Sequence, residues 1–141
     1  MSRDTMSIEE WRVLRNEKDT GKPKRKHDKK ESRMQKACVR YFRIKYPLFK
    51  NLLFAIPNGG SRNLLEAANM KEEGVISGVP DLFLAISKQG YNGFFLEAKV
   101  KPNKLSRNQE DMIKHLKKQG YKVEVFWSYD EFVELIDNYL K

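Results

Sequence analysis

The sequence has very few of the residues that build metal–thiolate and metal–imidazole sites. It contains one cysteine, Cys38, and two histidines, one of which, His27, lies in a basic tract. These counts exclude an intramolecular disulfide, a Cys/His zinc site and a centre of the HNH kind. The chain also lacks a G-x4-G-K-[ST] phosphate loop and a G-x-S-x-G elbow. We therefore expect neither a P-loop ATPase nor a serine hydrolase, and no nucleotide cofactor.

Long hydrophobic runs are absent as well. The longest ones, residues 52–56 and 82–86, have five residues each, whereas a helix that spans a bilayer needs about 20. Residues 1–6 contain no apolar core of a secretory signal, so we expect a cytoplasmic protein with no membrane partner. A single cysteine agrees with such a reducing compartment.

Positive charge, in contrast, is abundant and unevenly placed. The 141 residues carry 28 Lys and Arg against 19 Asp and Glu, and residues 1–50 hold 16 of these cations with only 7 of the acids. The basic tract at residues 22–30 indicates a polyanionic partner, either nucleic acid or an anionic membrane surface, unless it only improves solubility. On DNA, its residues Lys24, Arg25 and Lys26 would contact phosphates without reading bases, so binding would weaken as salt increases.

Hydrophobic spacing predicts one α/β domain behind this arm. With 40% apolar residues the chain can bury one modest core, which we place at 29–141, with the arm at 1–28. Helical spacing and capping signals predict helices at about 7–18, 30–46, 62–73, 106–120 and from 128 onward. Strand patterns occur at 52–56, 81–86, 93–100 and 122–127, with the middle two forming a hairpin. A hairpin combined with helical crossovers indicates a mixed central sheet flanked by helices.

The hairpin carries charges where an apolar strand is expected. Strand alternation places Glu97 and Lys99 on the same face. If the loop is centred near residues 89–90, residues that oppose each other sum to about 179, which puts Asp81 beside Glu97 and Ala98, within roughly 5–8 Å. One divalent cation could then bridge the two carboxylates.

This arrangement suits phosphodiester chemistry. Carboxylate oxygens are hard ligands that Mg²⁺ prefers, and a bound ion polarises a phosphodiester and lowers the pKa of a bound water. Lys99 would stabilise the negative charge of the transition state. The alternative is that Glu97 and Lys99 are a solvated pair on an edge strand and that Asp81 is a turn residue. The Val-Pro that precedes Asp81 and the basic arm favour the catalytic interpretation.

The same residues resemble the signature of the PD-(D/E)xK nucleases. The first acid lies in GVPDLFL at residues 78–84, and the second acid and the lysine lie in FLEAK at residues 95–99. Other blocks resemble the VRR-NUC branch of that superfamily. These are ESRMQ at 31–35, PNGGSR at 57–62, Gly74 with Gly78, and LSRNQ at 105–109. The likeness extends from about residue 31 to residue 138 and leaves out the first 28 residues.

The resemblance implies a restriction-endonuclease-like α/β fold and metal-dependent cleavage of DNA. Asp81 and Glu97 would bind Mg²⁺ or Mn²⁺, with the Ala98 carbonyl oxygen as a third ligand. Lys99 would position or activate the attacking water. Glu31 would approach the metal from the first core helix.

Other roles implied by the resemblance have simpler alternatives. Gln109 would support the site from the next helix, but it also completes a capping box with Ser106. Glu31 could pair with Lys30 or with Gln35, the residue one turn away that we also expect near nucleic acid. A further segment is either a tight turn or, as we favour, a phosphate contact at a helix N-terminus. Its residues are Asn58, Gly59, Gly60, Ser61 and Arg62.

The sequence therefore predicts a metal-dependent DNA endonuclease. Short VRR-NUC proteins resemble Holliday junction resolvases and tend to be homodimers, so the resemblance implies branched DNA as the substrate and two copies of the chain. It also implies a stand-alone phage or bacterial protein, which acts in the host cytoplasm if phage-encoded. The alternatives are a catalytically silent DNA-binding module, such as a subunit of a repair or replication assembly, and an enzyme that cuts RNA. A silent module has no need of a carboxylate pair that repels phosphates.

Overall fold

The structure is a computed structural model that describes residues 26–57 and 64–141. Several predictions fall outside these residues: the helix at 7–18, the phosphate contacts of Lys24 and Arg25, and the turn at 58–62. For Lys26 only the backbone is described. The roles proposed for these residues stay predictions.

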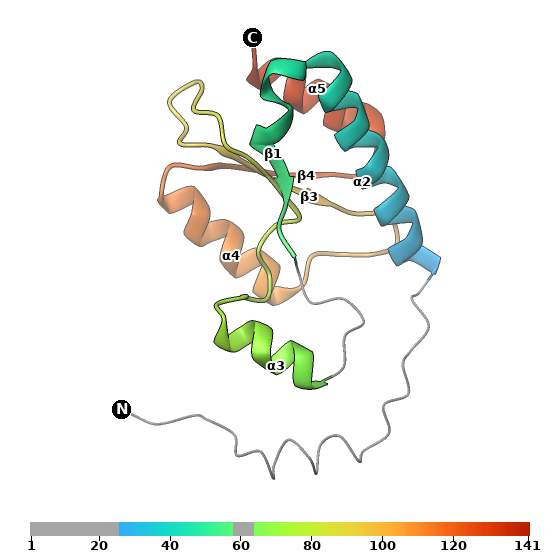
Figure 1. The fold of residues 1–141 in the computed structure, drawn as a ribbon, viewed down its shortest axis with the longest axis vertical. Helices are drawn as coiled ribbons and strands as arrows, with labels where there is room; N and C mark the ends of the chain where they lie inside the picture. Colours follow the sequence, from blue (N-terminus) through green and yellow to red (C-terminus); the bar gives the residue numbers. More distant parts are fainter. Residues whose placement is uncertain (1–25, 58–63) are drawn as a thin grey trace.

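The described elements follow the order that the sequence predicts. They are α2 (Lys26–Lys45), η1 (Pro47–Leu52), β1 (Leu53–Ala55), α3 (Leu64–Glu72), β2 (Leu82–Leu84), β3 (Phe94–Ala98), α4 (Arg107–Lys118), β4 (Lys122–Phe126) and α5 (Tyr129–Tyr139) (Figure 1). Each strand is one to three residues shorter than predicted, and two further details differ. Helix α2 begins at Lys26 rather than near residue 30 because Lys and Arg are good helix formers and the tract has no proline after Pro23. The 3₁₀ helix η1 begins at Pro47, whose fixed φ suits a first helical turn.

The four strands form one mixed sheet in the order β1-β2-β3-β4. The pairs β1–β2 and β2–β3 are antiparallel, whereas β3 and β4 are parallel. A parallel pair needs a crossover connection, and α4 lies in the chain between β3 and β4. The predicted hairpin and the predicted mixed sheet are both confirmed.

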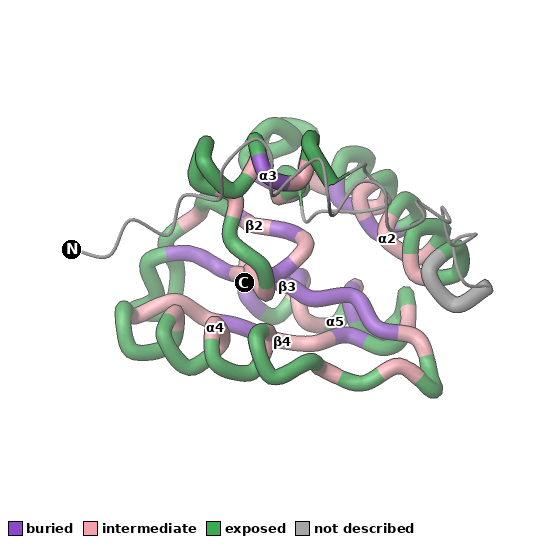
Figure 2. The backbone as a smooth tube through the Cα atoms, turned by 90° about the horizontal axis from the view of Figure 1, so that it is seen from below, coloured by how far each residue is buried: buried purple, intermediate pink, exposed green. Residues whose placement is uncertain are grey.

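Helices α2 and α5 cover one face of the sheet, and α4 lies on the other side (Figure 1). The core between the sheet and α2 with α5 includes Cys38, Phe42, Leu82, Leu96 and Phe132, all fully buried. Figure 2 shows the buried residues concentrated in the strands and the exposed ones on the outer sides of the helices. None of the described helices is long and apolar enough to cross a membrane.

A carboxylate ties the C-terminal helix to α2. Asp137 accepts hydrogen bonds from the Tyr41 hydroxyl at 2.8 Å, the Tyr46 hydroxyl at 2.6 Å and the Lys45 ammonium at 2.8 Å. These donors hold the pKa of Asp137 below its usual range, although burial opposes them, and burial with the Asp137 hydrogen bond raises that of Tyr46 to about 12. The cluster joins residues more than 90 positions apart and so fixes α2 against α5.

We expect Asp137→Asn to lower the free energy of unfolding by about 1–2 kcal/mol, because the three donors lose the carboxylate charge and the amide nitrogen cannot accept the bond from Lys45. Urea unfolding followed by circular dichroism measures this loss. The control is Glu134→Gln, which removes the charge of an exposed side chain on the same helix. Equal free energies of unfolding for the two variants would show that the cluster does not stabilise the fold.

Candidate active site

The register of the hairpin brings Asp81 and Glu97 together. Leu82 lies opposite Leu96, so Asp81 falls opposite Glu97 at the next position, within one residue of the predicted pairing. Each carboxylate accepts a hydrogen bond from the other strand's backbone. The Asp81 amide donates to Glu97 Oε2 at 3.1 Å, and the Ala98 amide donates to Asp81 Oδ2 at 3.0 Å.

A glycine before the hairpin allows this approach. Gly78 has φ +92°, and a Cβ atom at this position would lie 2.5 Å from the carbonyl oxygen of Asn108 at the start of α4. The backbone therefore passes α4 in contact with it, which only glycine permits. The chain then continues through the buried Pro80 into Asp81, so the packing of this segment against α4 sets where β2 begins.

Lys99 and Gln109 complete the surroundings of Glu97. The Gln109 side-chain amide donates to Glu97 Oε1 at 2.8 Å, and the Lys99 Nζ lies 3.9 Å from the same oxygen. Gln109 also makes the capping box, because its Oε1 accepts from the Ser106 amide at 2.9 Å. One side chain therefore completes the capping box of α4 and donates a hydrogen bond to Glu97, and its support of a catalytic site stays a prediction.

Burial makes this carboxylate pair electrostatically unfavourable. Glu97 is 3% exposed and Lys99 is 9% exposed. Burial, followed by the charge of Asp81, raises the pKa of Glu97 to about 8. Burial, with a smaller contribution from the charge of Glu31, raises the pKa of Asp81 above its usual range. Two carboxylates in a poorly hydrated place with one ammonium nearby form a site that further positive charge would stabilise.

The donor set fits a hard divalent cation. Among the described residues, no group of three or more His, Cys, Asp or Glu side chains gathers around one point. Mg²⁺ does not need such a cage, since it binds through one or two carboxylates and keeps several waters. Asp81 and Glu97 supply the carboxylates, and Ala98, between Glu97 and Lys99, offers the predicted carbonyl oxygen. The residues present therefore fit Mg²⁺ or Mn²⁺.

Glu31 lies beside this pair but is held by other partners. Its Oε1 accepts from the Val100 amide at 3.2 Å and from the Asn103 side-chain amide at 2.7 Å. These bonds dock the start of α2 against the end of β3. Among the described residues, Glu31 therefore pairs with Val100 and Asn103 rather than with Lys30 or Gln35, the alternative partners on its own helix. Its role as a metal ligand stays a prediction.

Asn103 is a residue that sequence reasoning missed. It follows Pro102 in a Pro-Asn pair, which is a common turn signal and so gave no reason to expect a contact with α2. Gln35 is a residue that the sequence predicts to lie near nucleic acid. It is half-buried on α2 one turn after Glu31, and this placement leaves the prediction open.

Comparison with known proteins agrees with this geometry. The model of the VRR-NUC domain family matches residues 23–129, which include α2, the hairpin and α4. The chain belongs to the VRR-NUC domain family. One solved structure that resembles it, described as a VRR_NUC domain protein, has 24% sequence identity, a TM-score of 0.68, and a match over 78% of this chain and 87% of that chain. No curated protein matches significantly.

Membership in the VRR-NUC family confirms the resemblance seen in the sequence, and the solved structure confirms the α/β fold with its mixed sheet and flanking helices. The PD-(D/E)xK superfamily is consistent with both findings. A VRR-NUC domain indicates nuclease activity and therefore nucleic acid as the substrate. The family match begins at residue 23 and so includes part of the segment that we assigned to the arm.

Proposed function

We propose that this VRR-NUC domain is a DNA endonuclease that depends on Mg²⁺ or Mn²⁺ and acts in the cytoplasm. The observation that carries the proposal is the pair of the half-buried Asp81 and the buried Glu97, with the buried Lys99 beside it. A pair that repels itself and lies largely out of water destabilises the fold unless a cation or a proton neutralises it. In a nuclease domain, this pair has a use as the metal-binding centre.

Each side chain of the centre has a separate task. Asp81 and Glu97, with the Ala98 carbonyl, would hold the ion, which when bound polarises the scissile phosphate and makes a water nucleophilic near neutral pH. Lys99 places its ammonium next to Glu97 Oε1, where it can orient the attacking water and stabilise negative charge on the phosphoryl oxygens. Gln109 holds Glu97 in one orientation, and we assign Glu31 to the edge of the site.

The finer features of the substrate belong to the same proposal. We propose branched DNA, with the arm and the turn at residues 58–62 contacting phosphates and Gln35 lying near the nucleic acid. Cleavage of a labelled four-way junction, a flap, a linear duplex and the matching RNA by the full chain tests it. Faster cutting of the junction or flap supports the proposal. Preferential cutting of RNA, or equal cutting of all DNAs, would contradict it.

A homodimer is the assembly that suits two cuts in a branched molecule, because two-fold symmetry presents two equivalent sites. The end of α2 and η1 expose apolar side chains that a second copy could cover, with Ile44 73% and Leu48 92% exposed. Light scattering of the full chain should give twice the 16.6 kDa mass of one chain. A mass of one chain, with and without DNA, would contradict the dimer.

The catalytically silent module remains the competing function. A domain that only binds DNA gains nothing from Asp81 and Glu97, whose negative charge weakens phosphate binding. Neutralising one carboxylate therefore separates the two: an enzyme stops cutting and binds DNA at least as tightly, whereas a silent module has no cutting to lose.

The two tasks of Gln109 can be tested separately. We expect Gln109→Ala to reduce the cleavage rate by about 10- to 100-fold, the usual effect of removing a partner that orients a metal ligand. Ser106→Ala removes the other half of the capping box but leaves the Gln109 to Glu97 hydrogen bond in place. Single-turnover cleavage with thermal unfolding of both variants checks this. Equal loss of rate in both would mean that Gln109 acts only through the helix.

A further inference from the structure

Helix α2 carries a row of cations on its outer side, which we call the α2 stripe. Its members are Lys29, Arg33, Lys36, Arg40 and Arg43, all exposed. They are spaced by four, three, four and three residues, so at 100° per residue they lie on one side of the helix. Cys38 and Phe42, which are fully buried in the core, lie on the opposite side.

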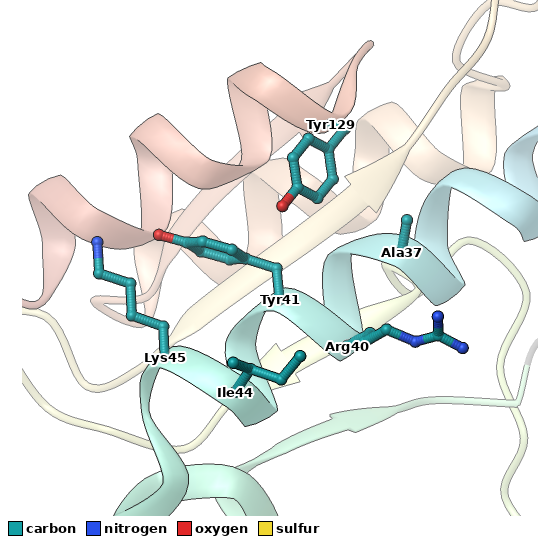
Figure 3. Close-up of a pocket in the computed structure, with 6 residues that line it drawn as sticks. All are labelled: Ala37, Arg40, Tyr41, Ile44, Lys45 and Tyr129. Carbon is teal, nitrogen blue, oxygen red and sulfur yellow. The ribbon is translucent and has the colours of Figure 1, made fainter.

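The described part of the protein does not neutralise the stripe. No hydrogen bond or ion pair joins any of its side chains to another described side chain, and the described lysines that do form ion pairs are Lys45, Lys99 and Lys122. Arg40, Tyr41 and Lys45 all line the groove between α2 and α5, and in Figure 3 the guanidinium of Arg40 extends away from the other two side chains.

Another basic helix shows what an ordinary solvated surface looks like in this chain. Helix α4 exposes Lys114, Lys117 and Lys118, but its first turns also expose Glu110 and Asp111, and Glu110 precedes Lys114 by four residues, a favourable spacing. The α2 stripe has no such acid among its members. Repulsion between like charges along a helix destabilises the helix. A bound polyanion would relieve this repulsion in the stripe.

The stripe begins beside the active site and leads away from it. Glu31, on the core side of the first turns of α2, accepts from the Val100 amide, directly after Lys99. From Lys29 to Arg43 the stripe extends about 21 Å along the helix axis, at 1.5 Å per residue. Glu31 joins α2 to the site from the side of the helix opposite the stripe. Because the helix is about 10 Å thick, we expect a straight duplex in the site to leave the stripe uncovered.

We propose that the α2 stripe binds the phosphate backbone of a second arm of a branched DNA while a first arm occupies the active site. This inference rests on the proposed nuclease function and deepens it, since it gives a physical reason for preferring branched over linear DNA. Phosphates of one strand are spaced by about 3.4 Å along the duplex axis, so the stripe spans roughly six base pairs. The contacts are to phosphates and do not read the sequence.

The test compares two triple variants of the full chain. The stripe variant carries Arg33→Gln, Lys36→Gln and Arg40→Gln, and the control carries Lys114→Gln, Lys117→Gln and Lys118→Gln, so both lose the same charge. Binding of a four-way junction and of a short linear duplex is measured in EDTA over a range of salt concentrations. We expect the stripe variant to bind the junction about tenfold or more weakly, with a log–log salt slope smaller by roughly two to three. Its loss on the short duplex should be much smaller, and the control should resemble wild type on both DNAs.

Three results would overturn the inference. One is an equal loss of affinity in both triple variants, and another is an equal loss on junction and duplex. The third is unchanged junction binding with weaker binding to vesicles that contain phosphatidylserine, which would assign the stripe to a membrane surface. Cleavage by wild type in Mg²⁺ separates these failures from failure of the proposed function. If wild type cuts DNA but the stripe variant binds as the control does, only the inference about the stripe is wrong. If wild type does not cut DNA, the proposed nuclease function is wrong.

Discussion

Replacing Lys99 by methionine is expected to lower the single-turnover cleavage rate by about 100- to 1,000-fold, the usual effect of losing one group that stabilises transition-state charge. Methionine retains most of the length of the side chain, so packing at this buried position changes little. The ammonium beside Glu97 is lost, and with it the only cation that the described part of the site places within 4 Å of either carboxylate. Rates are measured at saturating enzyme so that binding does not limit them.

The matched control for Lys99 is another lysine on a strand. Lys122 on β4 lies 3.8 Å from Glu124, two residues away, just as Lys99 lies two residues from Glu97. Lys122→Met should cut DNA at nearly the wild-type rate. Wild-type cutting by Lys99→Met would contradict its catalytic role, and unfolding of that variant in urea well below the wild-type midpoint would assign Lys99 to the stability of the fold instead.

The second large effect concerns the carboxylate pair and the pH. The pKa of Glu97, about 8, lies above the usual value for a glutamate, so the folded protein holds a proton that the unfolded chain releases near pH 4.5. Without metal, stability contributed by this group is therefore present at low pH and falls as the pH rises from about 4.5 to about 8. Asp81→Asn removes the neighbouring charge and should make the metal-free protein more stable than wild type at pH 8.

Bound Mg²⁺ should make wild type more stable than Asp81→Asn at pH 8. At about a hundredfold excess of free Mg²⁺ over its dissociation constant, binding adds about 2.7 kcal/mol to wild type, which raises the unfolding temperature by roughly 5–10 °C. Asp81→Asn should lose most of this increase, bind DNA at least as tightly as wild type and no longer cut it. Scanning calorimetry at pH 5 and pH 8, with EDTA or Mg²⁺, measures the effect. The control is Asp111→Asn, an exposed aspartate of α4. A metal-induced increase that is equal in wild type and Asp81→Asn would rule out Asp81 as a ligand.

The hairpin and its charges could be predicted because they depend on local spacing. Strand alternation and a short loop determine which residues face each other, and this placed Asp81 opposite Glu97 to within one position. The same is true of the capping box that begins α4 and of the Ser128 N-cap that begins α5, where the signals lie within four residues. Short-range patterns of this kind carry most of the information about secondary structure in one sequence.

Contacts between distant segments could not be predicted in the same way. Asp137 receives hydrogen bonds from residues more than 90 positions earlier, and Glu31 meets Asn103 across 72 positions. No spacing rule relates such residues, because the packing of whole helices on the sheet brings them together. The joint role of Gln109 in a helix cap and at Glu97 has the same origin: the cap is local, but the contact with β3 depends on how α4 lies on the sheet.

The charge of α2 illustrates a third limit on what the sequence alone predicts. The sequence predicts a solvated basic arm at 1–28 and a helix at 30–46, and the structure extends that helix back to Lys26, so that the cations from Lys29 to Arg43 lie on one regular helix. Helix formation converts a diffuse excess of charge into a row with a fixed direction, and docking through Glu31 sets the opposite side of that helix next to the active site. Charge counting alone points to the basic tract at residues 22–30 and does not indicate which side of α2 a polyanion would contact.

The most direct test of the central claim is cleavage of a labelled four-way junction by wild type and by Glu97→Ala, each in Mg²⁺, in Mn²⁺ and in EDTA. We predict cutting by wild type with either metal, none in EDTA, and none by Glu97→Ala under any condition while its fold is retained. Cutting that persists in EDTA, or that survives the loss of Glu97, would show that the pair of Asp81 and Glu97 is not the catalytic centre.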